Sequence, residues 1–148
     1  MAQRFDYPPV WLLAALALAW GARHLFPIGA GQSVLVVPGW GLVLVAGALM
    51  GAAAARFLRH RTTIVPHRKP AALITDGLYR YSRNPIYLAD VLLLAGLIMV
   101  WGAHLAWPLV PLLAWVLQRR FILPEEARLR AAFGQATEQY FALTRRWI

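Results

Sequence analysis

The chain carries the segment Asp76-Gly-Leu-Tyr-Arg-Tyr-Ser-Arg-Asn-Pro-Ile-Tyr87, a polar, arginine-rich bend that leads into a long apolar run. The run extends from residue 85 to residue 117, and one straight helix of that length would measure about 50 Å. A hydrocarbon core is only about 30 Å thick. We therefore expect the run to fold back on itself at Trp101-Gly-Ala-His104, next to a second interfacial tryptophan and two prolines.

The composition excludes an ordinary soluble domain. Of 148 residues, 60% are hydrophobic and 14% are charged, which is too little polar surface for a water-soluble protein. We expect an all-α fold in one membrane domain, residues 1–148: an integral membrane bundle of about four transmembrane helices. The expected spans are 7–27, 34–58, 85–101 and 105–120, the first retained and not cleaved as a signal.

After Gln118 the sequence becomes amphipathic. Pro124 suits a first helical turn, and we expect a C-terminal interfacial helix at about 124–144 on the cytoplasmic membrane surface, with Gly134 as a candidate break. The apolar residues that recur at helical spacing are Leu129, Phe133, Ala136, Tyr140 and Leu143.

The basic residues predict the orientation. Arg23 alone lies between the first two spans, and the 101–104 turn has none. The other Lys and Arg residues therefore place both termini and any active site on the cytoplasmic side of a bacterial-type inner membrane. This topology and contact with anionic membrane lipid account for the net charge of +9. No groove-reading helix or stacking platform indicates nucleic-acid binding.

The bend contains more arginine and tyrosine side chains than the start of a helix requires. Asn84 as N-cap and Pro85 as first helical residue are ordinary. Arginines beside several tyrosines, in contrast, offer anion pairing together with aromatic surface. These residues are Tyr79, Arg80, Tyr81, Arg83 and Tyr87.

A second polar group, Glu125-Glu126, follows Pro124 at the cytoplasmic end of the fourth span. Acidic residues are common in a first helical turn. The chain has only six carboxylate side chains, however, and two adjacent ones at the mouth of a bundle could accept both hydroxyls of a ribose or hold an ammonium group.

Taken together, these signals resemble the membrane-embedded methyltransferases that include isoprenylcysteine carboxyl methyltransferases and phospholipid N-methyltransferases. The resemblance covers about half of the chain. It rests on Thr75-Asp-Gly-Leu-Tyr-Arg-Tyr-Ser-Arg-Asn-Pro-Ile-Tyr-Leu88, which is similar to the family's glycine, tyrosine and Arg-His-Pro-x-Tyr segment, then on Glu125-Glu126, Phe133-Gly134, Tyr140 and Arg145-Arg146-Trp147.

The resemblance implies that S-adenosyl-L-methionine binds at the cytoplasmic end of the last two spans, beneath the C-terminal helix. The cofactor-binding residues it implies are Leu78, Tyr79, Arg83, Asn84, Tyr87, Glu125 and Glu126. Asn84 stands where the family has histidine, and an amide hydrogen-bonds but cannot act as a titrating base.

Catalytic roles are expected for Arg83, Asp90 and Arg145. The two arginines would clamp a carboxylate of the cofactor or the substrate. Asp90 lies roughly 7 Å into the third span by helical rise, where an acid is costly unless it pairs or has a function. It either forms a salt bridge with an arginine near the membrane surface or serves as a base or ammonium-recognising group in the substrate cavity.

We therefore expect an enzyme that transfers a methyl group to a hydrophobic or amphiphilic acceptor, either a carboxylate oxygen or a lipid amine. The alternatives are an NADPH-dependent membrane reductase, since sterol reductases resemble this family in their final spans, and a non-catalytic membrane adaptor or transporter subunit.

Other features have simpler explanations. Gly47-x-x-x-Gly51 matches a small-residue packing motif, for which packing within the chain is expected and an oligomer is possible but not expected. The four histidines are scattered and predict no metal site. The absence of cysteine excludes disulfides and a cysteine nucleophile.

Overall fold

The computed structural model describes residues 7–26, 34–59 and 73–148. In this part of the chain the regular structure is helical, apart from one isolated parallel β-bridge between Ser82 and Arg145. The expected all-α fold is therefore confirmed for the described residues.

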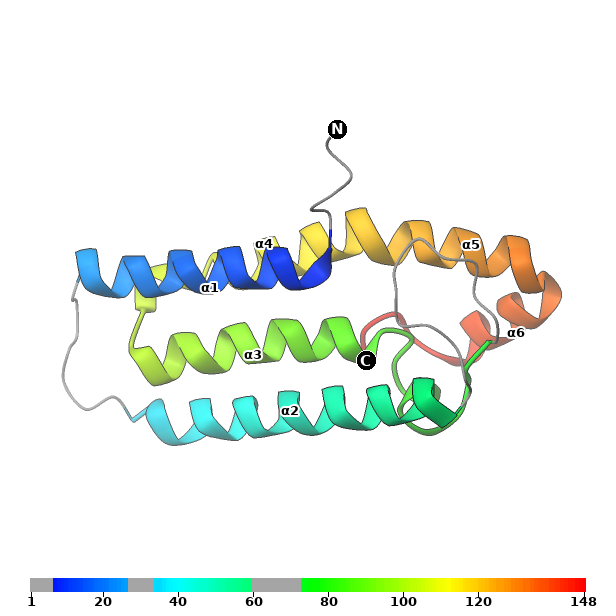
Figure 1. Cartoon of the computed structure of the whole chain (residues 1–148), viewed down its shortest axis with the longest axis horizontal. Helices are drawn as coiled ribbons and strands as arrows, with labels where there is room; N and C mark the ends of the chain where they lie inside the picture. The colour runs from blue at the N-terminus through cyan, green and yellow to red at the C-terminus, as the bar shows by residue number, and fades with distance from the viewer. Residues whose placement is uncertain (1–6, 27–33, 60–72) are drawn as a thin grey trace.

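Three long helices run alongside one another and form most of the bundle (Figure 1). They are α1 (Pro8–Leu25), α2 (Val36–Arg59) and α3 (Pro85–Trp101). α3 occupies the centre, since it contacts α1, α2 and α4 (Leu109–Leu117). The polar bend that precedes α3 contains a short 3-10 helix, η2 (Gly77–Arg80).

The chain reverses at the end of α3, as the sequence predicts. Gly102 has φ 64°, a left-handed conformation that glycine adopts without strain, and its N–H bonds the carbonyls of Ile98 and Met99. A second 3-10 helix, η3 (His104–Ala106), then leads into α4, which packs back against α3.

The helix that starts as α4 continues beyond the expected fourth span. It passes through a π-helical turn, η4 (Gln118–Ile122), into α5 (Leu123–Phe133). Pro124 has no N–H and clashes with the carbonyl four residues earlier, so a wider turn immediately before it lets the helix continue. Pro124 therefore lies inside a continuous helix and does not begin a separate one.

The expected interfacial helix over 124–144 is divided in two at Gly134, the candidate break that the sequence indicated, and a single amphipathic helix is not confirmed. α5 ends at Gly134, which has φ 51°, and α6 (Gln135–Leu143) turns back beside α5 (Figure 1). Of the apolar stripe expected there, only Tyr140 is buried, while Leu143 is 86% exposed. The glycine reverses the chain and breaks the continuous apolar face.

The core lies between α1, α3 and the α4–η4 helix. Its fully buried members include Leu94, Ile98, Leu117, Phe121 and Ile122. These side chains hold α3 in the middle of the bundle and thereby position the polar bend at its start.

α2 and α3 approach each other through a pair of glycines. A Cβ atom on Gly96 would lie 2.8 Å from the carbonyl oxygen of Gly39, and a Cβ on Gly39 would lie 2.9 Å from that of Gly96. A Cβ at Gly47 or Gly51 would meet nothing within 4 Å. The expected packing of Gly47-x-x-x-Gly51 within the chain is therefore wrong for the described residues. An oligomer through this motif, possible but not expected from the sequence, is untested.

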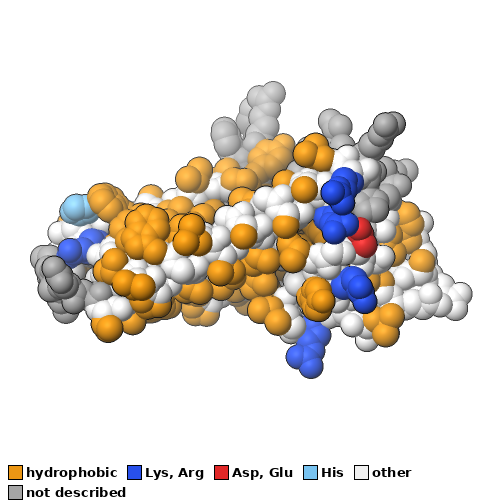
Figure 2. All heavy atoms as spheres, turned by 90° about the horizontal axis from the view of Figure 1, so that it is seen from below, with side chains coloured by type: hydrophobic (Ala, Val, Ile, Leu, Met, Phe, Trp, Pro, Cys, Tyr) orange, Lys and Arg blue, Asp and Glu red, His pale blue; other side chains and the backbone are white. Residues whose placement is uncertain are grey.

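The outside of the bundle is apolar. Figure 2 shows hydrophobic side chains over much of one face. Most of the Lys and Arg side chains and the acidic side chain in this view lie near one end, and a further basic side chain lies at the other end. Among the described helices, the segment Val36–Arg56 is long and apolar enough to cross a membrane, and Pro85–Trp101 is apolar but shorter. The four-span bundle and its organisation as one domain stay predictions.

Candidate functional site

Two arginines converge on Glu126 at the start of α5. Arg146 donates from Nε to Oε1 and from Nη2 to Oε2, both at 2.9 Å, in a bidentate pair. The Nη1 atom of Arg83 lies 3.2 Å from Oε1 of the same carboxylate. Glu126 is 3% exposed, so this charge is removed from water and compensated by two guanidinium groups.

The neighbouring Glu125 is joined to α3. Tyr87 donates a hydrogen bond from its hydroxyl to Oε2 of Glu125 at 3.2 Å, and the Tyr87 ring stacks on Phe121 of the π-helical turn with centroids 6.3 Å apart. The bend and the paired glutamates, which the sequence separates by about forty residues, therefore form one polar site.

The bend is fixed to the end of α2. Arg56 forms an ion pair with Asp76. Gly77 has φ 61°, and a Cβ there would lie 2.6 Å from Nε of Arg56, so glycine suits both the backbone conformation and the space. This contact positions η2 and the residues that follow it.

The C-terminal segment 140–147 contacts the bend and the π-helical turn. The Arg83 N–H donates to the Arg145 carbonyl at 3.0 Å, beside the Ser82–Arg145 bridge. The hydroxyl of Tyr140 donates to the Tyr79 carbonyl at 2.6 Å, and Trp147 donates to the side-chain oxygen of Gln118 at 3.0 Å. The C-terminal segment thus joins the bend, α6 and the π-helical turn.

Asn84 contributes to the same connection. It occupies the N-cap position of α3, but its side chain makes no capping bond. Instead Nδ2 donates to the carbonyl of Arg146 at 3.0 Å, and the Asn84 N–H donates to Oγ of Ser82 at 3.1 Å. The amide therefore helps to position Arg146, a contact that a capping preference alone does not predict.

Burial, hydrogen bonds and neighbouring charges shift the pKa values of Arg83, Arg146 and Tyr79. Burial lowers the pKa of Arg83, and the charge of Glu126 opposes that change. The hydrogen bonds to Glu126 raise the pKa of Arg146. Burial, reinforced by the charge of Glu125, raises the pKa of Tyr79, so this phenol is neutral at physiological pH.

Arg83 retains unused hydrogen-bonding capacity. Its guanidinium carbon lies 4.3 Å from the centroid of the Phe141 ring. Its Nε is buried and has no hydrogen-bond partner in the described chain. A buried donor without a partner is unusual, and this one lies in the cluster that contains Glu126.

The remaining predicted site residues are Leu78, Asp90 and Arg145, and they differ in how far they are buried. The Leu78 carbonyl accepts the Ser82 N–H at 3.1 Å and shapes the bend. Asp90 is 4% exposed inside the bundle, and the alternative that it forms a salt bridge with an arginine is not observed among the described residues. The Arg145 side chain is exposed.

Arg146 is the site residue that the sequence prediction missed. Adjacent arginines are equivalent in the sequence pattern, and the β-bridge at Arg145 determines which one turns toward Glu126. In an extended segment, successive side chains point to opposite sides, so Arg145 and Arg146 must point in different directions. This alternation could have identified Arg146 only if the pairing of the segment with the bend had been known.

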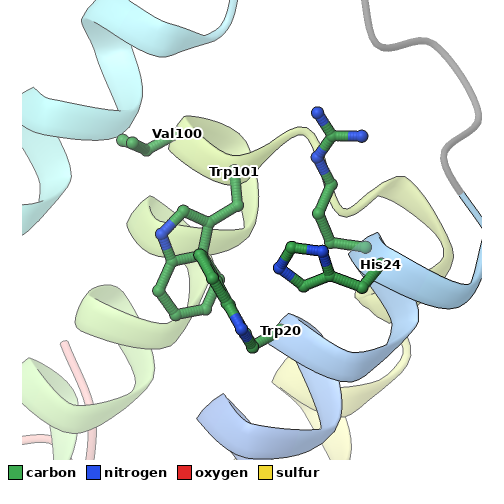
Figure 3. Close-up of a pocket in the computed structure, with 5 residues that line it drawn as sticks. Trp20, His24, Val100 and Trp101 are labelled. Atoms are coloured by element: carbon green, nitrogen blue, oxygen red, sulfur yellow. The ribbon is translucent and has the colours of Figure 1, made fainter.

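A cavity of about 400 Å³ lies at the other end of the bundle, where α1 and α3 finish. Figure 3 shows Trp20, His24 and Trp101 around it, with Trp20 in edge contact with both other rings. α3 is 17 residues long, or about 25 Å, so this cavity is separate from the Glu126 cluster. No group of three potential metal ligands occurs in the described part of the chain.

Residues 34–136, more than two thirds of the chain, match the family of phospholipid methyltransferases. The chain belongs to this family. It is also similar to the protein-S-isoprenylcysteine O-methyltransferase of Schizosaccharomyces pombe, with 36% identity over 72 residues. That similarity covers 49% of this chain and 30% of the relative, so the chain spans about a third of that protein's length. No solved structure matches the chain.

The phospholipid methyltransferase match includes the bend, α3, the π-helical turn and α5, and therefore both glutamates. It ends at residue 136, before Tyr140 and Arg146. The matched region thus supplies Arg83, Tyr87 and Glu126, and the segment beyond it supplies the second guanidinium.

Proposed function

We propose that this chain is an S-adenosyl-L-methionine-dependent methyltransferase that acts on a hydrophobic or amphiphilic acceptor at the cytoplasmic face of a bacterial-type inner membrane. The observation that carries the proposal is the buried Glu126 carboxylate held by Arg83 and Arg146, next to the Tyr87–Glu125 hydrogen bond. Membership of the phospholipid methyltransferase family supports the reaction class.

The residues at this site fit the chemistry of the methyl donor. The donor's amino-acid portion carries a carboxylate, for which the unpaired Nε of Arg83 is a suitable buried hydrogen-bond donor. Its ammonium and ribose hydroxyls suit a carboxylate such as Glu125, and its adenine suits aromatic surface. Leu78, Tyr79 and Asn84 would shape the wall of the same site from the bend.

When bound, the donor supplies an electrophilic methyl group on a positively charged sulfur. The contribution of this chain is to align an acceptor with that methyl group and to exclude water. Alignment converts an encounter between two molecules into a reaction within one complex. A dry environment also favours a reaction in which charge is neutralised or dispersed. No covalent intermediate with a side chain is required.

The acceptor is proposed to enter from the lipid. The outward faces of α2 and α4 carry exposed apolar side chains, including Leu44 at 72% and Leu112 at 52% exposed. An acceptor with a hydrocarbon chain would be soluble in the same environment. Arg145, exposed at the rim, is proposed to meet anionic groups of the substrate or of neighbouring lipid.

Ligand-dependent thermal stability tests the proposal directly. Purified protein in neutral detergent should gain stability with S-adenosylmethionine or its homocysteine product, by about 2.7 kcal/mol at a hundredfold excess over Kd. Glu126→Gln and Arg83→Ala should remove this gain. Glu138→Gln, which changes an exposed acid on α6, should retain it.

An assay with labelled methyl donor and lipid extract then tests transfer, and mass identification of the labelled product identifies the acceptor. Stabilisation by NADPH alone would contradict the proposal and favour a reductase. The absence of any nucleotide response, together with proton flux that depends on Asp90, would instead favour a transporter subunit.

A further inference from the structure

The cavity at the far end of the bundle is a second candidate site. It has a volume of about 400 Å³, and its lining residues are Trp20, Arg23, His24, Val100 and Trp101. They come from the last turns of α1 and α3, which end at Leu25 and Trp101. A cavity of this volume is in the range of small-molecule sites in proteins.

Arg23 gives the cavity a positive charge. The residue is half-buried, and no described residue forms an ion pair or a hydrogen bond with its guanidinium group. The acids of the described chain lie before α3, in its first half, or on α5 and α6. The charge of Arg23 is therefore available to an anion that enters the cavity.

Helix formation explains only part of this arrangement. A cation in the last turn of a helix is favoured by the helix dipole, and Arg23 and His24 both occupy the last turn of α1. Lys and Arg are depleted, however, on the non-cytoplasmic side of a membrane, and Arg23 is the only such residue between the first two expected spans. The dipole also does not account for the rings that surround it.

Two indole rings and an imidazole ring line the same cavity. The Trp20 ring is in edge contact with His24, with centroids 4.6 Å apart, and with Trp101, with centroids 5.1 Å apart. Figure 3 shows the three rings together. Trp20 is nevertheless 49% exposed. Because indole side chains prefer the membrane–water interface, the ring cluster places the cavity at the level of lipid headgroups.

An apolar surface continues from the cavity along α1. Leu13 precedes Trp20 by seven residues and His24 follows it by four, so the three share one face of the helix. Leu13 is 64% exposed and lies about 10 Å from Trp20 along the helix axis. This face gives a hydrocarbon chain a surface to lie against when its headgroup occupies the cavity.

We propose that the cavity binds an anionic phospholipid of the leaflet opposite the Glu126 cluster, with Arg23 and His24 holding the phosphate diester and Trp20 packing against the start of an acyl chain. A guanidinium group binds phosphate through paired N–H donors, and the imidazole supplies one more donor. Such a lipid would stabilise the contact between the ends of α1 and α3. This site does not depend on the proposed methyl-transfer function.

Thermal unfolding in neutral detergent provides the first test. Dihexanoyl-phosphatidylglycerol, a soluble anionic phospholipid, should raise the unfolding midpoint more than zwitterionic dihexanoyl-phosphatidylcholine or inorganic phosphate at the same concentration. Arg23→Gln should weaken the affinity for the anionic lipid by about tenfold or more, as expected for the loss of charge-assisted hydrogen bonds. Arg23→Lys should recover part of this loss. Arg119→Gln, which removes an exposed arginine from the π-helical turn, should keep the response.

Photocrosslinking then locates the bound lipid. A phosphatidylglycerol that carries a diazirine on its acyl chain, close to the glycerol, should label peptides that contain Trp20 or Trp101. Arg23→Gln should lose this labelling, and Arg119→Gln should keep it. Labelling confined to the basic segment 119–130 would overturn the proposed site. That comparison needs only the wild-type protein, so it applies even if Arg23→Gln does not fold.

Three further outcomes are decisive. Equal stabilisation by phosphatidylcholine would overturn selection by charge, and an equal, Arg23-dependent response to inorganic phosphate would replace the lipid by a free anion. The stability gained with S-adenosylmethionine should be the same in wild type and Arg23→Gln. Absence of that gain in wild type would count against methyl transfer and leave the lipid site standing.

Discussion

Glu126 accepts contacts from three guanidinium nitrogen atoms of two arginines while being almost completely buried. Such a carboxylate stabilises the fold only while both cations remain, because a buried charge without its counterpart is strongly destabilising. Its partners come from the bend and from the chain's last residues. A single side chain thus connects three segments that are distant in sequence.

Replacing Glu126 by Gln should lower the free energy of unfolding by about 2–3 kcal/mol. This value is below the cost of breaking a fully buried pair because the Arg146 side chain is 32% exposed. Chemical unfolding in detergent, followed by tryptophan fluorescence, measures the change. Glu138→Gln should cost at most about 1 kcal/mol, since its pair with Arg130 is on the surface. Equal losses in the two variants would contradict the importance of the buried cluster.

Tyr140→Phe should destabilise the protein by about 1–3 kcal/mol, because it removes the 2.6 Å hydrogen bond to the Tyr79 carbonyl and leaves that buried acceptor without this donor. The thermal-unfolding midpoint is the measurement. Tyr81→Phe is the matched control, because Tyr81 is 74% exposed and the same hydroxyl is lost to solvent. A midpoint that falls equally in both variants would argue against the Tyr140 bond.

At the scale of elements, the contact between α2 and α3 depends on backbone proximity. Gly96→Ala should cost about 1–3 kcal/mol, the usual range for overpacking, because the new methyl group would meet the Gly39 carbonyl at 2.8 Å. Gly51→Ala should be neutral or slightly stabilising, since that face is open and alanine favours helix. Folded yield and unfolding midpoint compare the two variants. A larger loss of stability in Gly51→Ala than in Gly96→Ala would contradict the close contact between Gly96 and Gly39.

The unequal distribution of charge along the whole molecule predicts its orientation. The cationic residues of the described bend, π-helical turn and α5 lie at one end, and Arg23 lies at the other. In intact cells, a membrane-impermeant maleimide should label Leu105→Cys, which lies on the exposed turn before α4. Glu138→Cys should be labelled only after permeabilisation. The natural chain has no cysteine, so the background is low. Labelling of both positions from one side would refute this topology.

Much of the helical layout could be predicted from local patterns. The expected spans at 34–58 and 85–101 lie close to α2 and α3, and the chain reverses at Gly102. These features depend on residues near one another in sequence: apolar runs, a proline at a helix start, a glycine at its end. The helix boundary at residue 124 was not predictable in the same way, because the π-helical turn lets the chain continue through Pro124.

The candidate site was predictable as two halves. The sequence indicated the bend and the glutamate pair, and resemblance to a family assigned them to one cofactor. It could not indicate that Arg146, and not Arg145, meets Glu126, that Asn84 bonds the Arg146 carbonyl, or that Asp90 has no partner among the described residues. Each of these facts depends on the direction of a side chain relative to a distant segment.

The sequence by itself determined the helical class, the positions of the long helices and the residue types available for chemistry, because hydrophobic periodicity and helix termini act over a few residues. Only the tertiary structure decided which glycines touch, where the C-terminal segment lies and which of the described charges pair with one another. These outcomes depend on close packing and on burial of charge between segments far apart in the chain, and local sequence patterns contain no information about such distances.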